Sequence, residues 1–67
     1  MFVVAAYFDG VFSVWRDSDG GWVTIAGAEW EQILGMGTPK TLAEGKTVLA
    51  RMAYQWPNCS CFLVSLI

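Results

Sequence analysis

The residues FVVAAYFDGVFSVWR, Phe2–Arg16, decide the fold because they form two apolar runs joined by a short polar turn. Asp9-Gly10 stands between the runs, and this dipeptide suits a type I′ turn, in which both central residues have positive φ. Side chains alternate along the second run, so Phe12 and Val14 share one face of a strand. The sequence therefore predicts a β-hairpin.

A third strand is expected after the polar turn at residues 17–21. Alternation resumes in Trp22–Ala26, where Val23 and Ile25 point away from Trp22 and Thr24. Together with the hairpin, this segment predicts a three-stranded antiparallel meander.

The stretch Ala28–Leu34 admits two interpretations. As a fourth strand it would place Trp30, Gln32 and Leu34 on one face, whereas a short helical turn would bring Trp30, Ile33 and Leu34 together. Glycines bracket the stretch as they often bracket hairpin strands. We favour the strand.

The best-marked element is a helix that begins after Thr41 and ends near Gln55. Thr41-Leu42-Ala43-Glu44 matches a capping box, and Thr38 followed by a proline is the alternative start. The buried stripe is expected to comprise Leu42, Gly45, Leu49, Met52, Ala53 and Trp56. Gly45 would let the helix approach the sheet closely, and the solvent face is expected to comprise Lys40, Glu44, Thr47 and Arg51.

Ser60–Ile67 is predicted to be the last strand. It is apolar on both faces, which is typical of a strand that is central in its sheet or covered by a partner. The fold class is therefore α+β, with an antiparallel sheet of four or five strands in the order β-β-β-(β)-α-β and one α-helix packed on one face. Residues 1–67 are expected to form a single compact domain.

The composition argues against acid–base catalysis. The chain has no histidine, which is the usual proton carrier at neutral pH, and only six acids and four bases. Yet it has four Trp, two Tyr and four Phe, and 55% of its residues are hydrophobic. Charged residues make up 15%, against about 25% in an average domain. We expect no enzyme and no cofactor, but a binding protein with an exposed apolar patch.

The acids and tryptophans are the candidate partner-binding residues. Five of the six acids lie in residues 1–37, where Arg16 is the single base, so this half should attract a basic protein and repel nucleic acid. Carboxylates in pairs can also bind metal or act as acid and base, but aspartates in turns usually cap their own backbone. Each tryptophan could equally fill the core. The candidates are Asp17, Asp19, Glu29, Glu31, Trp15, Trp22 and Trp30, with no catalytic and no metal-binding residue.

Cys59 and Cys61 would share one face of an extended strand, where a disulfide between them would be strained. Two thiolates are half a zinc site, and no histidine can complete it. We expect two reduced, partly buried thiols, with a shared metal or an intermolecular disulfide as the alternatives.

The sequence contains no membrane or targeting signal that we recognise. Met1–Phe8 is apolar but lacks a positively charged start, and no run approaches the roughly 18 apolar residues that span a bilayer. We expect a cytoplasmic protein without membrane contact.

Two resemblances add to these expectations. The order of elements resembles that of the HicB-like antitoxin domain. The residues that carry the resemblance are Gly20-Gly21-Trp22, which open a strand, and Gly37-Thr38, which lead into Thr41-Leu42-Ala43-Glu44. That resemblance implies a β-β-β-α-β core and an antitoxin-like module. Separately, Ser60–Ile67 is apolar on both faces and could pair with a copy of itself, so we expect a monomer or a weak homodimer through the C-terminal strand.

The whole chain is similar to the small acidic anti-CRISPR proteins of phages and mobile elements, particularly inhibitors of type I (Cascade) systems. The likeness rests on size, acidity, compact α+β organisation and lack of catalytic residues. It implies a non-catalytic inhibitor that binds a surveillance complex in the host cytoplasm and blocks DNA binding at basic surfaces. By this resemblance, the residues expected to contact the basic surface of the complex are Asp17, Asp19, Glu29 and Glu31.

Overall fold

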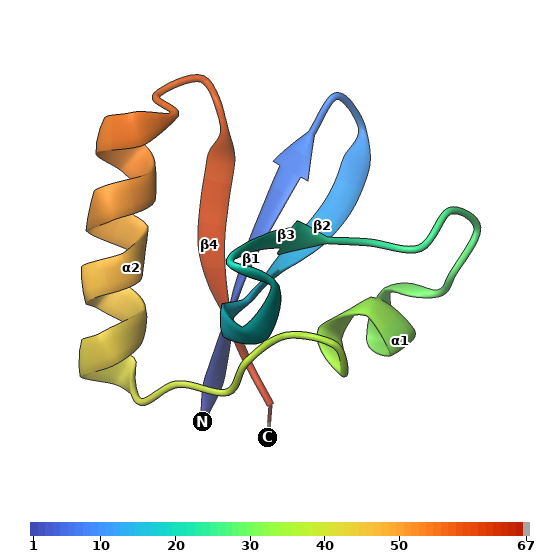
Figure 1. The fold of residues 1–67 in the computed structure, drawn as a ribbon, viewed down its shortest axis with the longest axis horizontal. Coiled ribbons are helices and arrows are strands. Elements are labelled where there is room, and N and C mark those ends of the chain that lie inside the picture. The colour runs from blue at the N-terminus through green and yellow to red at the C-terminus, as the bar shows by residue number, and fades with distance from the viewer. Residues whose placement is uncertain (67) are drawn as a thin grey trace.

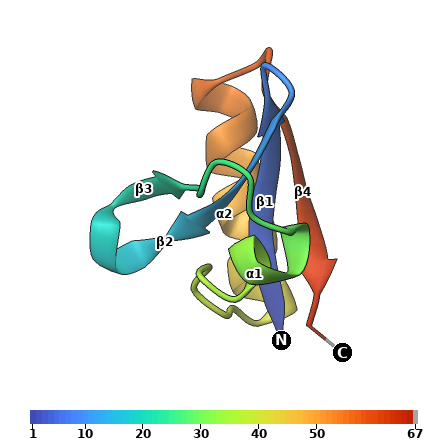
Figure 2. The same ribbon diagram turned by 90° about the vertical axis from the view of Figure 1, so that its right-hand side faces the viewer.

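The computed structural model describes residues 1–66 as a four-stranded antiparallel sheet with helices on both faces (Figures 1 and 2). The strands are β1 (Phe2–Phe8), β2 (Val11–Arg16), β3 (Gly21–Val23) and β4 (Ser60–Ser65). The helices are a 3-10 turn, η1 (Asp17–Asp19), a short helix, α1 (Trp30–Leu34), and a long helix, α2 (Leu42–Gln55). The sheet order is β3-β2-β1-β4, so the expected α+β class and antiparallel sheet are confirmed.

The hairpin between β1 and β2 is confirmed. Phe8 pairs with Val11, which leaves a loop of two residues between the strands. Asp9 has φ 51° and Gly10 has φ 77°, the positive values that a type I′ turn requires. Asp tolerates this conformation better than most residues because its short polar side chain adds little steric cost.

The third strand is shorter than predicted, because β3 ends at Val23 rather than at Ala26. Trp22 pairs with Trp15, and Val23 with Val14. Beyond them the Thr24 hydroxyl, at 2.7 Å, donates to the carbonyl oxygen of Phe12. A side chain thus replaces the next backbone pair, and the chain leaves the sheet.

The strand favoured for Ala28–Leu34 is wrong, since residues 30–34 form α1. The backbone N–H of Glu29 donates to Oε1 of Gln32 at 3.0 Å, which satisfies a group at the start of the helix. Ile33 and Leu34 are buried against the sheet, as the helical alternative required, whereas Trp30 is 53% exposed.

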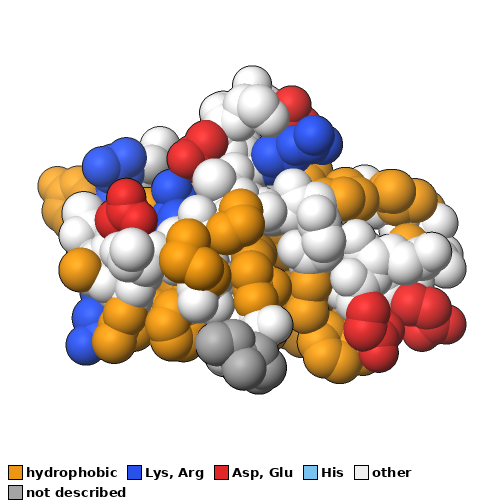
Figure 3. Space-filling view, turned by 90° about the horizontal axis from the view of Figure 1, so that it is seen from below, with side chains coloured by type: hydrophobic (Ala, Val, Ile, Leu, Met, Phe, Trp, Pro, Cys, Tyr) orange, Lys and Arg blue, Asp and Glu red, His pale blue; other side chains and the backbone are white. Residues whose placement is uncertain are grey.

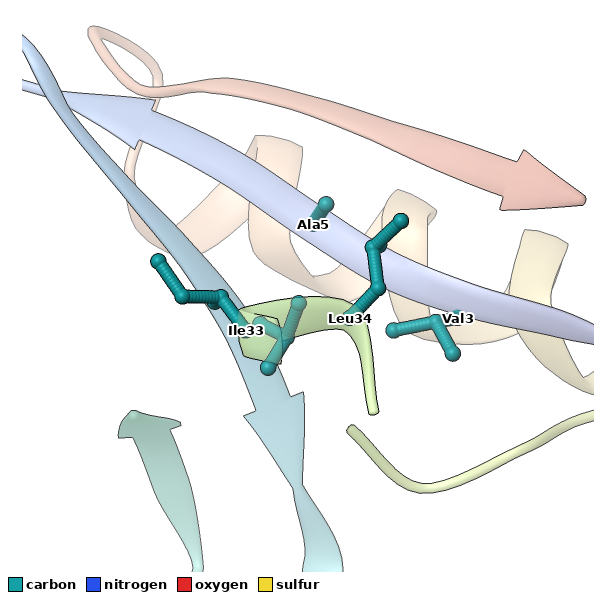
Figure 4. Packing of buried hydrophobic residues seen from close by; sticks show 5 residues of the cluster. Val3, Ala5, Ile33 and Leu34 are labelled. Carbon is teal, nitrogen blue, oxygen red and sulfur yellow. The ribbon is translucent and has the colours of Figure 1, made fainter. Parts of the chain in front are cut away.

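One cluster of the core lies between α1 and the sheet (Figure 4), and Val4, Ala6 and Met52 are buried on the α2 side. Val3, Ala5 and Val14 form the floor of the α1 cluster, and Ile33 and Leu34 close it from above. The chain between α1 and α2 passes close to this floor at Gly37, where an added Cβ would collide with Val3 and lie 3.2 Å from Cβ of Val14. Only glycine fits there.

On the opposite face, α2 packs against β4 and β1. Its capping box is confirmed: the Glu44 N–H donates to Oγ1 of Thr41 at 3.2 Å, and the Thr41 N–H donates to Oε1 of Glu44 at 3.0 Å. Thr41 is therefore the N-cap. Gly45 lets the helix approach the sheet as expected, because an added Cβ would lie 2.7 Å from Cδ2 of Leu63.

The buried stripe of α2 is narrower than predicted. Gly45 and Met52 are buried and Leu49 is half-buried, but Ala53 is exposed, Leu42 is 46% exposed and Trp56 is 36% exposed. The reason is that α2 rests on two strands only. The solvent face was also predicted wrongly at Lys40, which is more buried than expected. Lys40 exchanges two backbone hydrogen bonds with Phe2, and its side chain is only 12% exposed.

The last strand lies at the edge of the sheet, not at its centre. β4 pairs with β1 alone, from Phe2 opposite Ser65 to Tyr7 opposite Ser60. Its side chains are apolar on both faces, as predicted, because Leu63 faces α2 while Phe62 and Val64 pack towards the α1 core. Ile67, the predicted end of this strand, lies outside the described residues.

Candidate binding surface

The α2 face of the sheet is only half covered. Because α2 lies over β4 and β1, the same face of β2 and β3 carries no long helix (Figure 2). The side chains that point to this face come from alternate positions, among them Ser13 and Trp15 on β2 and Trp22 on β3. This uncovered half-face brings large aromatic side chains to the surface.

Trp15 and Trp22 form a pair there. They are direct partners across β2 and β3, their ring centroids are 5.4 Å apart, and their planes meet at 84°. This edge-to-face arrangement is favourable for aromatic rings. Both side chains are half-buried, so each supports the other and still presents surface to solvent.

A pocket of about 200 Å³ opens beside this pair. Trp22 forms one wall, and Trp56 forms another from just beyond the end of α2. The complete lining comes from β1, β2, β3 and the turn after α2: Ala6, Phe8, Ser13, Trp22, Trp56 and Cys59. We call this pocket together with Trp15 the tryptophan groove. It is too small for most cofactors but large enough for one apolar side chain of a partner.

Asp17 lies beside the groove, but its charge is already compensated. Its carboxylate accepts a hydrogen bond from the Trp15 indole at 3.0 Å and forms a 2.9 Å ion pair with Lys40. Its backbone N–H donates to Oγ1 of Thr38 at 2.8 Å. The hydrogen bond from Lys40 is the largest influence on this group and lowers the pKa of Asp17 below its ordinary value of 3.8. Asp17 therefore fixes the orientation of Trp15 and the path of the chain towards α2.

The other predicted residues divide between two faces. Asp19 is exposed in η1, next in the chain to the groove strands. Glu29, Glu31 and Trp30 are exposed at α1, on the opposite side of the sheet. In Figure 3 acidic side chains lie at the right-hand end of the molecule and also, next to basic side chains, at the upper left and the top, around the hydrophobic side chains in the middle of that view. The seven candidates thus do not form one site, and Trp15, Trp22, Asp17 and Asp19 are the four that stay together.

Trp30 borders a second hollow, on the α1 side of the sheet. This hollow has a volume of about 470 Å³, is shallow and open, and is lined largely by the loop at residues 24–28 and by Tyr7 and Phe12. It shares no lining residue with the tryptophan groove.

The sequence analysis missed five residues of the groove: Ala6, Phe8, Ser13, Trp56 and Cys59. Trp56 follows Met52 at helical spacing, which placed it in the core. The helix ends at Gln55 and the backbone at Trp56 is no longer helical, with φ −131° and ψ 78°, so the indole turns towards the bare half of the sheet. The dipeptide Trp56-Pro57 was the available signal, because proline disfavours helical backbone at the residue before it.

The described part of the chain offers no group of three or more His, Cys, Asp or Glu side chains placed to hold a metal ion. Among residues 1–66 no helix is both long enough and apolar enough to cross a bilayer.

Comparisons with known proteins add no family to this description. No protein-family model, no curated protein and no solved structure matches the chain.

Proposed function

We propose that this protein is a non-catalytic binding protein that inhibits a nucleic-acid-handling complex, in the manner of the type I anti-CRISPR proteins it resembles. The observation that carries the proposal is the tryptophan groove: an apolar pocket of about 200 Å³ between Trp22 and Trp56, with Trp15 packed beside it. It acts in the cytoplasm, where such complexes work.

The groove suits protein recognition because two of its tryptophans, Trp15 and Trp22, are held against each other before binding. Trp15 is fixed by Trp22 and by the carboxylate of Asp17, so little side-chain freedom is lost when a partner docks. Tryptophan is the residue type most enriched among interface positions that dominate binding energy. A leucine or aromatic side chain of the partner would fill the pocket.

Charge plays a smaller part than the acidity of the chain suggests. Asp17 is paired with Lys40, which leaves Asp9, next to Phe8, and Asp19 as the exposed acids nearest in sequence to the groove. Such acids add attraction at the rim of an interface, where they affect the association rate more than the affinity. We therefore infer recognition by shape and aromatic contact, with modest dependence on salt.

The test is inhibition of DNA binding by purified type I surveillance complexes. Each complex is mixed with its target duplex and increasing amounts of the protein, and bound DNA is measured by gel shift at low and high salt. The expected result is stoichiometric loss of DNA binding for at least one complex, changing little with salt. Undiminished DNA binding at a large excess of protein, across the complexes tested, would contradict the proposal.

Two tryptophan variants locate the surface. Trp22→Ala should weaken inhibition by at least about tenfold, the effect typical of a central interface residue. Trp30→Ala is the matched control, because it removes the same side chain from the opposite face and should leave inhibition unchanged. Circular dichroism of both variants verifies the fold. Equal effects of the two substitutions would count against the groove.

A second candidate function, a self-associating module, is favoured by β4. This strand is an edge strand without charge or proline in Ser60–Ser65, and natural proteins usually protect such edges with charged residues, proline or bulges. The occupant would be a second copy of the chain, because an uncharged strand is compatible with an antiparallel copy of itself about a twofold axis.

A further inference from the structure

Two sulfur atoms meet at the start of β4. The Cys61 thiol donates to Sγ of Cys59 over 3.5 Å, and the Cys59 thiol donates to the carbonyl oxygen of Tyr7 over 3.9 Å. Both cysteines are free thiols and both are partly buried. The sulfurs are thus in van der Waals contact without a bond.

The backbone that brings them together is bent. The sequence analysis expected strain in a disulfide if both cysteines lay in one extended strand. In the structure β4 begins at Ser60, as predicted, and the Cys59 N–H donates to the carbonyl oxygen of Trp56 at 3.0 Å, which closes a turn. Cys59 therefore belongs to the turn and not to the strand, and the spacing of an extended backbone does not apply to the pair.

We propose that Cys59 and Cys61 are a reversible dithiol–disulfide modification site, oxidised by a small disulfide such as oxidised glutathione. The Cys59 thiolate attacks one sulfur of oxidised glutathione, forming a mixed disulfide and releasing one glutathione thiolate. Cys61 then loses its proton to solvent and attacks Sγ of Cys59, which breaks the mixed disulfide and releases the second glutathione. Two protein thiols become one disulfide, and one small disulfide becomes two thiols.

The surroundings assign the two roles. Cys59 lines the open pocket, where a small disulfide can reach it first. Cys61 lies within β4, and burial, followed by its hydrogen bond to Cys59, raises its pKa to about 11, so it is a poor first nucleophile. A disulfide bond is about 2.05 Å long, so the sulfurs must approach by about 1.5 Å. Cys59 can move because the strand pairing begins only at Ser60.

A disulfide also needs no ligand beyond the two cysteine sulfurs, unlike a metal site. A structural zinc site needs four protein ligands, and no such cluster exists among the described residues. Closing the bond would remove the Cys59 thiol proton, and with it the hydrogen bond to Tyr7. It would also tie the turn after Trp56 to β4, at the wall of the tryptophan groove.

The test compares the folded and the unfolded chain. Fully reduced protein is equilibrated in a series of buffers with different ratios of reduced to oxidised glutathione. Exchange is stopped with acid, and the mass of the intact protein is measured by mass spectrometry. The expected main product is a monomer lighter by two hydrogen atoms, which dithiothreitol reverses. In guanidinium chloride the ratio of internal disulfide to glutathione adduct should fall by at least about tenfold, because the fold no longer holds the sulfurs together.

Single-thiol variants serve as controls. Cys59→Ser and Cys61→Ser should give glutathione adducts only. For the native chain, a glutathione adduct or a disulfide-linked dimer as the main product would overturn the proposal. An equal product ratio in the unfolded chain would overturn it too, and that comparison needs no variant to fold. The readout is mass, so the outcome is independent of whether the tryptophan groove binds a partner.

Discussion

Two glycines, Gly37 and Gly45, allow the chain to pass close to the sheet where a larger residue would not fit. The sequence pattern indicated this role for Gly45 but not for Gly37. Gly45 stood in an otherwise apolar helical stripe, which signalled that the helix comes close to the sheet, and Leu63 indeed occupies the space that its Cβ would need. Gly37 gave no such signal. It looked like one more glycine flanking a turn, and only the tertiary path shows that it touches two buried valines.

Gly37→Ala should destabilise the fold. The added methyl group would collide with Val3 and crowd Cβ of Val14, and both side chains are fully buried, so neither can move aside. Overpacking of this kind costs about 1–3 kcal/mol of unfolding free energy. Urea denaturation measures it. Gly35→Ala is the control, because its Cβ would make only ordinary contacts from 3.5 Å outwards; equal loss in both variants would show that steric contact is not the cause.

Thr41→Ala should lose about 1 kcal/mol of unfolding free energy, the usual value of an N-cap. Thr41 accepts from the Glu44 N–H, which no other side chain is placed to satisfy in the same way. Thr47→Ala removes a threonine from the exposed side of the same helix and should be neutral or slightly stabilising, since alanine favours helix. A neutral Thr41→Ala would mean that the helix starts elsewhere in solution.

At the scale of elements, the sequence predicted well wherever local signals agreed. The hairpin has its turn dipeptide and α2 has its capping box, and both are where the pattern placed them. Residues 28–34 carried a weaker signal: Gln32 follows Glu29 at the spacing of a capping box, but glutamate is not one of the usual N-cap residues. Period 2 and period 3.6 both fitted the stretch, and the decision came from tertiary packing, which buries the adjacent pair Ile33 and Leu34 together, as one face of a helix can but one face of a strand cannot.

The candidate site was predictable only in part, for the same reason. Trp15 and Trp22 were named as candidates, each on a strand of clear alternation, but their direct pairing across β2 and β3 was not predicted. Trp56 could not be placed, because its position depends on where α2 stops relative to the bare half of the sheet. Helical periodicity carries no information on what lies beyond the last turn.

Met52→Ala tests the packing of α2 on the sheet. Met52 is 1% exposed and is the largest fully buried side chain of the described residues, so its truncation should cost about 2–5 kcal/mol of unfolding free energy. Tyr54→Ala on the same helix is the control, because Tyr54 is 92% exposed and should change stability by less than about 0.5 kcal/mol. Similar losses in the two variants would contradict the orientation of α2.

Acid should weaken the attachment of α2. The Lys40 hydrogen bond lowers the pKa of Asp17, and the backbone N–H of Thr41 lowers the pKa of Glu44 from 4.5. Both carboxyls hold their protons more weakly when folded, so their contribution is present above the ordinary pKa values and is lost as pH falls through the folded ones. The melting temperature should therefore drop between about pH 5 and pH 2.

Lys40→Met is the control for that titration. It removes the ion pair and should make the dependence of melting temperature on pH shallower, while costing less than about 1 kcal/mol at neutral pH because Asp17 is exposed. A wild-type melting temperature that stays constant over the acid range would show that neither carboxyl is stabilised by folding.

For the molecule as a whole, the unexpected feature is that β4, a strand with apolar side chains on both faces, lies at an edge of the sheet. The sequence analysis expected a strand apolar on both faces to be central in its sheet or covered by a partner. The central position is wrong, because within the chain α2 covers one face of β4 and the α1 core covers part of the other while the strand lies at the edge. Both faces of a strand can be covered by packing while its backbone edge stays without a neighbouring strand. The edge is where a second copy would add.

The backbone pattern makes this pairing testable residue by residue. The Leu66 N–H donates to the carbonyl oxygen of Met1, and hydrogen-bonded pairs alternate in an antiparallel ladder. Phe62 and Val64 therefore direct their N–H groups to β1, whereas Cys61 and Leu63 direct theirs outwards. In a monomer the amides of Phe62 and Val64 should exchange slowly with deuterium, and those of Cys61 and Leu63 quickly.

If β4 pairs with a second copy, raising the protein concentration should slow exchange at Cys61 and Leu63 and leave Phe62 and Val64 unchanged, because only the outward amides gain a partner. Sedimentation over the same concentrations should show the mass rising from 7.4 kDa towards twice that value. Ser60→Lys places a charge on the edge and should keep the chain monomeric, as edge lysines do in natural sheets. Ser18→Lys adds the same charge in η1 and should not. Constant mass and constant exchange at all four amides would leave the tryptophan groove as the sole binding surface argued from this fold.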